Sequence, residues 1–137
     1  MELKTREINL ILEAIELGND MAIGRIKVEN IGMETIIHIG KAFIKCFPGS
    51  KSFIPTNNSI FVELEKGLIE LGYEKIVVLE NGTKVKIKGL NIKGTIGGND
   101  LENSEDDLSN LNYYVIPIGK SFDDEIMVHK DDIEAIN

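Results

Sequence analysis

The chain has 137 residues, of which 42% are hydrophobic and 28% are charged, and its formal net charge is −8. This composition is typical of one globular domain or two small lobes and excludes an intrinsically disordered chain. No apolar stretch reaches the roughly 20 residues of a bilayer-spanning helix. The negative total also opposes non-specific binding to nucleic-acid phosphates.

The single cysteine and the first residues point to an intracellular protein. Cys46 has no second cysteine with which to form a disulfide or a zinc knuckle. The opening MELKTREINL has an acidic residue at position 2 and no apolar region before its first charges, unlike a secretory signal peptide. We therefore predict a cytoplasmic location.

Two helices are expected at the ends of the first half of the chain. One extends from Thr5 to Gly18, since apolar residues recur there every three or four positions. The other begins near Asn58 or Ser59 and ends at Gly72. After the first helix, the segment AIGRIKVEN fits either a short strand or a helical turn.

A third helix is expected between Asn30 and Pro48. Asparagine is a suitable N-cap, proline ends helices, and the apolar residues between them share one helical face. If the rest of the chain leaves this face uncovered, it becomes a homodimer interface. The candidate residues for that interface are Met33, Ile37, Ile44 and Phe47.

From residue 76 onward the apolar residues alternate with polar ones, which predicts strands. Glycines and an Asn81-Gly82 pair mark turns between them. The expected strands cover 76–79, 84–88, 91–98, 113–118, 126–129 and 132–136.

The succession GTKVKIKGLNIKGTI, YYVIPI and EIMVHKDDIEAI resembles an SH3-like barrel, with a tight turn before a short last strand. Within it, Val85-x-Ile87 followed by Gly89 and Lys93-Gly94 is similar to a KOW segment. The resemblance covers only residues 76–136. Together with the helices predicted in residues 1–72, we expect an α+β fold in which these helices pack on an antiparallel barrel or rolled sheet in residues 73–137, forming one compact unit.

An acidic segment separates two of the expected strands and is the first candidate binding site. It lacks the central glycine of an EF-hand loop, so a surface that meets a basic protein is the better interpretation. The candidate partner-binding residues are Asp100, Glu102, Glu105, Asp106 and Asp107. Small acidic proteins of this kind are common among phage and mobile-element accessory proteins and inhibitors.

No set of residues predicts catalysis, a metal ion or a cofactor. His129 precedes Asp131 and Asp132, but adjacent aspartates do not converge easily on one metal, and either suits the cap of a one-turn helix. We therefore predict a non-enzymatic protein that binds a protein partner without a metal or cofactor.

A lysine-bearing strand offers an alternative nucleic-acid or ribosome-associated binding face, and a small-molecule site between helices and barrel is a second alternative. Alternating lysines on a strand also prevent sheet edges from aggregating. The candidate residues of the nucleic-acid face are Lys84, Lys86, Lys88, Lys93 and Tyr113.

Overall fold

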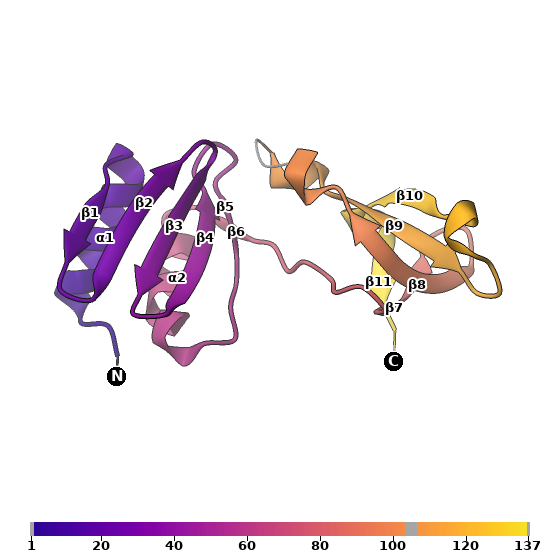
Figure 1. Cartoon of the computed structure of the whole chain (residues 1–137), viewed down its shortest axis with the longest axis horizontal. Coiled ribbons are helices and arrows are strands. Elements are labelled where there is room, and N and C mark those ends of the chain that lie inside the picture. Colours follow the sequence, from indigo (N-terminus) through magenta and orange to yellow (C-terminus); the bar gives the residue numbers. More distant parts are fainter. Residues whose placement is uncertain (1, 104–106, 137) are drawn as a thin grey trace. The chain divides into compact units, whose positions relative to one another are not determined.

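The computed structural model describes residues 2–103 and 107–136. It divides into two compact units, Met1–Val77 and Val78–Asn137, so the division falls later than the predicted one after residue 72. Helices and mostly antiparallel sheets occur together (Figure 1), which confirms the predicted α+β class. Each unit is described by itself.

The first unit contains a six-stranded sheet in the order β1-β2-β3-β4-β5-β6. Neighbouring strands are antiparallel except β5 and β6, which are parallel. The strands are β1 (Met21–Ile23), β2 (Ile26–Ile31), β3 (Glu34–Ile39), β4 (Ala42–Phe47), β5 (Ser52–Ile54) and β6 (Glu74–Lys75).

Helices α1 (Thr5–Leu17) and α2 (Val62–Glu70) cover one face of this sheet, with a 3-10 turn η1 (Ser59–Phe61) before α2. These two predicted helices are confirmed. Gly18 ends α1 in the left-handed conformation, at φ 68°, and its N–H bonds to carbonyls of the last helical turn. The Asn58 side chain accepts a hydrogen bond from the N–H of Ile60, as a cap residue should.

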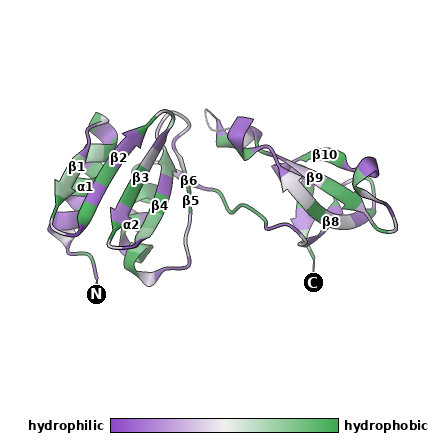
Figure 2. Cartoon of the chain, in the orientation of Figure 1, coloured by the Kyte–Doolittle hydropathy of each residue, from purple (hydrophilic) through white to green (hydrophobic). Residues whose placement is uncertain are grey.

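The first unit's core lies between the helices and the sheet. Hydrophobic and hydrophilic residues alternate at the start of β2 (Figure 2), and buried and half-buried residues alternate along β3, so each strand directs one set of side chains at the helices. The buried apolar cluster includes Ile11 and Ile15 of α1, Leu64 and Leu68 of α2, and Ile37 of β3. The helices therefore bury their apolar faces on a sheet of their own unit.

The helix predicted between Asn30 and Pro48 is wrong, because this segment forms β3, β4 and the turn between them. Three Ile-Gly pairs mark the hairpin turns of the unit, at Gly24, Gly32 and Gly40, where φ is 56°, 58° and 62°. A positive φ at the first residue of a two-residue loop suits a tight hairpin and needs glycine. These glycines end strands and do not interrupt a helix.

The second unit is a five-stranded antiparallel sheet in the order β10-β9-β8-β7-β11, with β10 and β11 as its edges, so the barrel is not closed. Short 3-10 turns connect several strands. The elements are β7 (Lys84–Ile87), β8 (Ile92–Asn99), η2 (Leu101–Asn103), η3 (Leu108–Asn110), β9 (Asn112–Pro117), η4 (Phe122–Asp124), β10 (Ile126–His129), η5 (Lys130–Asp132) and β11 (Ile133–Ala135).

Five of the strands predicted in the second half are confirmed, and one is not. Residues 76–79 form no strand, although Ile76 is buried. The register between β8 and β9 shifts between Ile96 and Gly98, which is a β-bulge. Such a bulge increases the local bend of a strand, so the glycines of β8 curve the sheet as their spacing suggests.

Candidate functional site

The outer face of β8, β9 and β10 carries an apolar patch whose side chains are not buried in the core. Its residues are Tyr114, Ile116, Phe122 and Met127, referred to below as the apolar patch. Phe122 and Met127 keep 69% and 61% of their surface exposed, while Tyr114 and Ile116 are half-buried. Tyr114 and Met127 are direct cross-strand partners. Isolated exposed apolar residues are common, but a contiguous group marks an interaction surface.

Two glycines of β8 lie under this patch. A Cβ atom at Gly97 would lie 2.8 Å from Cδ1 of Ile116 and 3.6 Å from Cε1 of Phe122, so both side chains rest against this glycine. A Cβ atom at Gly98 would lie 3.5 Å from Cδ2 of Tyr114. The strand therefore brings no side chain of its own between the patch residues, and their exposed surfaces remain accessible.

Acidic residues border the apolar patch. Asp123, Asp124 and Glu125 follow Phe122 directly, are exposed, and lie on or next to η4, which contacts β9. Lys120 is the nearest lysine along the chain. Residues 78–137 contain 6 lysines and 12 acidic residues, so the second unit has a net charge of −6. This surface combines apolar contact area with a negative border.

The acidic segment predicted to bind a partner is partly engaged in its own loop. Asp100 accepts hydrogen bonds from the backbone and side-chain nitrogens of Asn112, at 2.7 and 3.1 Å. Asp107 accepts hydrogen bonds from the hydroxyl and the N–H of Ser109 and so caps η3, and these two hydrogen bonds, the hydroxyl's first, lower the pKa of Asp107. Glu102 is exposed on η2.

The remaining two predicted acidic residues, Glu105 and Asp106, lie outside the described residues. Two of the other three carboxylates thus have a clear structural role, which is to hold the connection between β8 and β9 in shape. The acidic segment stays a prediction, and the sequence analysis missed the apolar patch. The pattern that could have revealed part of the patch is the apolar residue at the outward positions Tyr114 and Ile116 of β9 and Met127 of β10.

The predicted lysines gather on β7 and β8. Lys86 and Lys93 are direct cross-strand partners, and Lys86 also lies opposite Glu134 of β11. The Nζ atom of Lys88 donates a hydrogen bond to the carbonyl of Asp131. Among the described residues, neither Lys84, Lys86 nor Lys93 has an ion pair within 4.0 Å.

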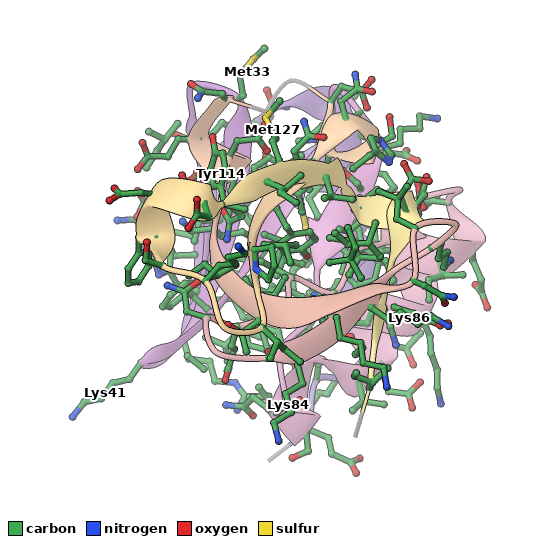
Figure 3. All side chains as sticks on the ribbon, turned by 90° about the vertical axis from the view of Figure 1, so that its right-hand side faces the viewer. Met33, Lys41, Lys84, Lys86, Tyr114 and Met127 are labelled. Atoms are coloured by element: carbon green, nitrogen blue, oxygen red, sulfur yellow. The ribbon has the colours of Figure 1, made fainter. Side chains whose placement is uncertain are left out.

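Tyr113 does not belong to this lysine face, which corrects its predicted role. Its side chain is 2% exposed, and its hydroxyl oxygen accepts a hydrogen bond from the N–H of Leu79. The neighbouring Tyr114 points outward, but with Met127 it lies on the opposite side of this unit from Lys84 and Lys86 (Figure 3). Tyr114 thus lies away from Lys84 and Lys86, although Ile116 of the apolar patch shares its outward face with Lys84 across Thr95.

The predicted dimer face is also wrong for three of its four residues. Ile37, Ile44 and Phe47 are buried, with at most 1% of their surface exposed. Strand alternation directs Ile37 and Ile44 into the core cluster between sheet and helices, whereas Phe47, three residues after Ile44, has the opposite parity in β4. Met33 is exposed in the turn between β2 and β3. The apolar spacing that suggested one exposed helical face belongs to a hairpin whose inner face holds Ile37 opposite Ile44.

His129 has a structural role that differs from the predicted cap. Its Nδ1 accepts the N–H of Asp131 and thereby caps η5, and its Nε2 lies 2.7 Å from the carbonyl of Ser109. This pattern corresponds to the neutral tautomer with the proton on Nε2. The imidazole therefore joins η5 to η3, whereas a cap by Asp131 or Asp132 was expected.

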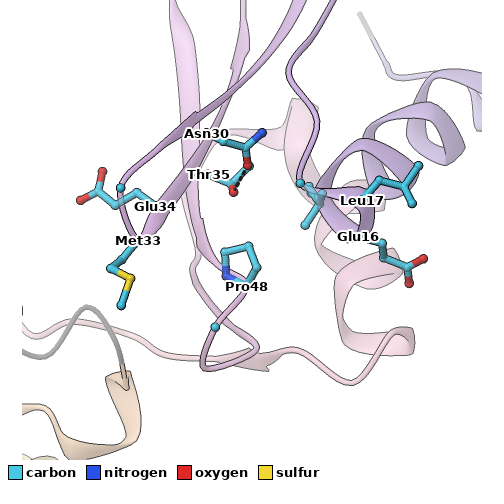
Figure 4. Close-up of a pocket in the computed structure, with 11 residues that line it drawn as sticks. Glu16, Leu17, Asn30, Met33, Glu34, Thr35 and Pro48 are labelled. Carbon is cyan, nitrogen blue, oxygen red and sulfur yellow. Dashed lines mark hydrogen bonds between the residues drawn. The ribbon is translucent and has the colours of Figure 1, made fainter.

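A cleft of about 400 Å³ opens in the first unit between the end of α1 and the turn between β2 and β3. At its edge, the Thr35 hydroxyl donates a hydrogen bond to Oδ1 of Asn30 at 2.7 Å. The carboxylates of Glu16 and Glu34 point away from Pro48 (Figure 4). These carboxylates thus do not converge on the cleft, whereas a small-molecule site needs a few polar groups that point at the same place.

Cys46 lies in the core, and burial is the main cause that raises its pKa to about 12. Within residues 2–103 and 107–136, no three histidine, cysteine or acidic side chains gather closely enough to hold a metal ion. None of the helices in the described part of the chain is long and apolar enough to span a membrane. The chain matches no family model, no curated protein and no solved structure.

Proposed function

We propose that this chain is a non-enzymatic binding protein of the cytoplasm, whose second unit captures a basic segment of a protein partner on the apolar patch. The observation that carries the proposal is the apolar patch itself. Three of its four side chains lie over the glycines of β8, Met127 pairs with Tyr114, and acidic residues follow Phe122. Interfaces place exposed aromatic and methionine side chains at their centre and polar residues around them.

The charge around the patch favours a partner with a positively charged segment. A unit with a net charge of −6 attracts lysine- and arginine-rich segments and repels acidic ones. Apolar contact would supply most of the affinity, and the carboxylates of η4 would set the preference for a positive segment. The acidic segment 100–107 would add to this long-range attraction without direct contact.

A peptide-display selection with the full chain as bait tests the proposal. We expect the selected peptides to be rich in lysine and arginine around one apolar anchor residue, and to bind more weakly as salt increases. The Phe122→Ser and Met127→Ser variants should each weaken binding of the selected peptides roughly tenfold or more, because each loses a large apolar contact.

The matched control is Leu90→Ser. Leu90 is 63% exposed in the turn between β7 and β8, on the same unit but beside the lysines. This variant should bind the selected peptides as the unchanged chain does. Selection of acidic peptides, failure to select any, or equal losses in all three variants would contradict the proposal.

A second candidate function is nucleic-acid binding through the lysines. The observation that favours it is the pairing of Lys86 with Lys93, because like charges directly opposite each other destabilise a sheet unless an anion lies between them. Binding of single-stranded RNA or DNA at low salt, lost in Lys86→Glu and falling steeply with salt, would support this function. Absence of binding at low salt would end it.

A further inference from the structure

The free edge of the first unit's sheet leads to an inference about self-association. β1 is an edge strand that only its shortness protects, because its three residues include no charged side chain, proline or bulge. These are devices by which proteins usually protect a strand edge. Ala22 and Ile23 are exposed on β1, and α1 lies beside this edge (Figure 1).

The backbone of this edge strand has N–H and C=O groups that do not bond to β2. Ile23 and Ile26 face each other across a two-residue hairpin loop, so they form a hydrogen-bonded pair. Ladder alternation then directs the N–H and C=O of Ala22 away from β2. An added antiparallel strand can pair with Ala22 at this position.

Two hollows line the space between α1 and β1, and they share Leu10. One, of about 210 Å³, contains Lys4, Arg6 and Ile23 in its lining. The other, of about 190 Å³, contains Glu13 and Asp20. Leu10 therefore lies level with the middle of β1, with a basic end on one side and an acidic end on the other.

Both ends keep charge available for a partner. Arg6 and Glu13 are exposed, and neither has an ion pair among the described residues. Glu7 also lines the basic end, but its carboxylate accepts the N–H of Lys4 at 2.9 Å. Asp20 binds Asn30 through one carboxylate oxygen, and its pKa is lowered, so it stays negative at neutral pH.

This arrangement is complementary to itself. A two-fold axis through Ala22 pairs β1 with β1 of a second copy in antiparallel fashion and brings Leu10 against its own counterpart. The same axis places the basic end of each copy against the acidic end of the other, with Arg6 near Glu13. The two α1 helices then run antiparallel, which also aligns their dipoles favourably.

We propose that the occupant of this edge is a second copy of the same chain, so that two six-stranded sheets join through β1 into one continuous sheet. The interface is isologous, because each copy contributes the same surface. This dimer surface differs entirely from the one predicted from the sequence, and it is independent of the apolar patch of the second unit.

Sedimentation equilibrium of the full chain, from about 1 μM to about 1 mM, tests the proposal, a range that covers weak to moderate dimers. The unchanged chain should form dimers that weaken with salt. Arg6→Glu and Glu13→Arg should each raise the dimer dissociation constant roughly tenfold or more, since each change replaces two attractive contacts by two repulsive ones. Lys41→Glu, in the exposed turn between β3 and β4, is the matched control and should leave dimerisation unchanged.

Mixing the two variants gives the decisive result. Arg6→Glu and Glu13→Arg restore both charge pairs when one copy of each combines, so an equimolar mixture should form heterodimers about as strong as the unchanged dimer. The double variant should recover dimerisation by itself. A monomer at every concentration, a dimer insensitive to both changes, or a mixture without recovery would overturn the proposal.

Discussion

At the scale of single residues, close approach between strands decides which glycines of β8 are essential. A Cβ atom at Gly94 would lie 2.4 Å from the carbonyl oxygen of Ile116 and 3.0 Å from Cγ1 of Val115. The oxygen belongs to the backbone of the paired strand, so it has little freedom to move away. Gly98 has no such neighbour, because its nearest contact is the Tyr114 ring at 3.5 Å.

We predict that Gly94→Ala destabilises the protein by about 2–4 kcal/mol, because the strands must separate to admit the methyl group. Gly98→Ala is the matched control and should change stability by less than about 1 kcal/mol. Urea unfolding of both variants measures the difference. Equal stability of the two would show that β8 and β9 do not approach each other closely at Gly94.

Cys46 supplies a second prediction at this scale, on pH. Burial raises its pKa from an ordinary 9.0 to about 12, so the folded state holds the thiol proton more tightly than the unfolded chain. The stability that this provides is fully present below pH 9 and is lost as pH rises towards 12. The Glu65 carboxylate contributes in the same direction.

The free energy of unfolding should therefore fall more steeply between pH 9 and 11 in the unchanged chain than in Cys46→Ala. Burial raises the pKa of Tyr73 in both proteins, and that part cancels in the comparison. The negative charge of an ionised Cys46 raises the pKa of Tyr73 further, so its loss in Cys46→Ala changes the slope in the same direction. Urea titrations at stepped pH measure both slopes. Parallel slopes would mean that the thiol titrates normally in the folded protein.

At the scale of elements, the sequence predicts the helices and strands that the local pattern of residues determines. The alternation of Val85 and Ile87 identified β7 correctly, and the apolar stripe identified α1, although the N-cap is Lys4 and Thr5 is the first helical residue. The prediction of a helix over residues 33–47 was wrong because the apolar residues there fit both a helical and a strand period. Ile37 and Ile44 share a helical face, yet they are also cross-strand partners in β3 and β4.

The Ile-Gly turns were the feature that could have decided between the two periods. At Gly40, φ is 62° and a Cβ atom would meet nothing within 4 Å, so only the backbone conformation requires glycine there. Gly49 has equally open surroundings but does not have a positive φ. Substituting alanine at each of these two glycines therefore measures the cost of the backbone conformation alone, because neither methyl group meets another atom.

We therefore expect Gly40→Ala to destabilise the first unit by about 1 kcal/mol, the cost of a left-handed conformation for a residue with a Cβ atom. Gly49→Ala should be neutral or slightly stabilising. Thermal unfolding monitored by circular dichroism compares them. A neutral Gly40→Ala would contradict a tight glycine turn between β3 and β4.

At the scale of the whole molecule, the chain's uneven charge was visible in the sequence, but the surfaces were not. Residues 78–137 carry most of the negative charge, and composition alone shows this. Position in the fold decides the rest. Asp100 and Asp107 serve their own loop, Tyr113 turns inward, and the outward residues Tyr114 and Met127 come from neighbouring strands that the folded sheet pairs.

The most direct test of the central claim is to map where a selected basic peptide binds the full, nitrogen-15-labelled chain by NMR. We predict amide shift changes concentrated at Gly97, Gly98, Tyr114, Phe122 and Met127, with little change at the lysines of β7. Changes confined to β7 or to the first unit would show that the apolar patch is not the binding surface.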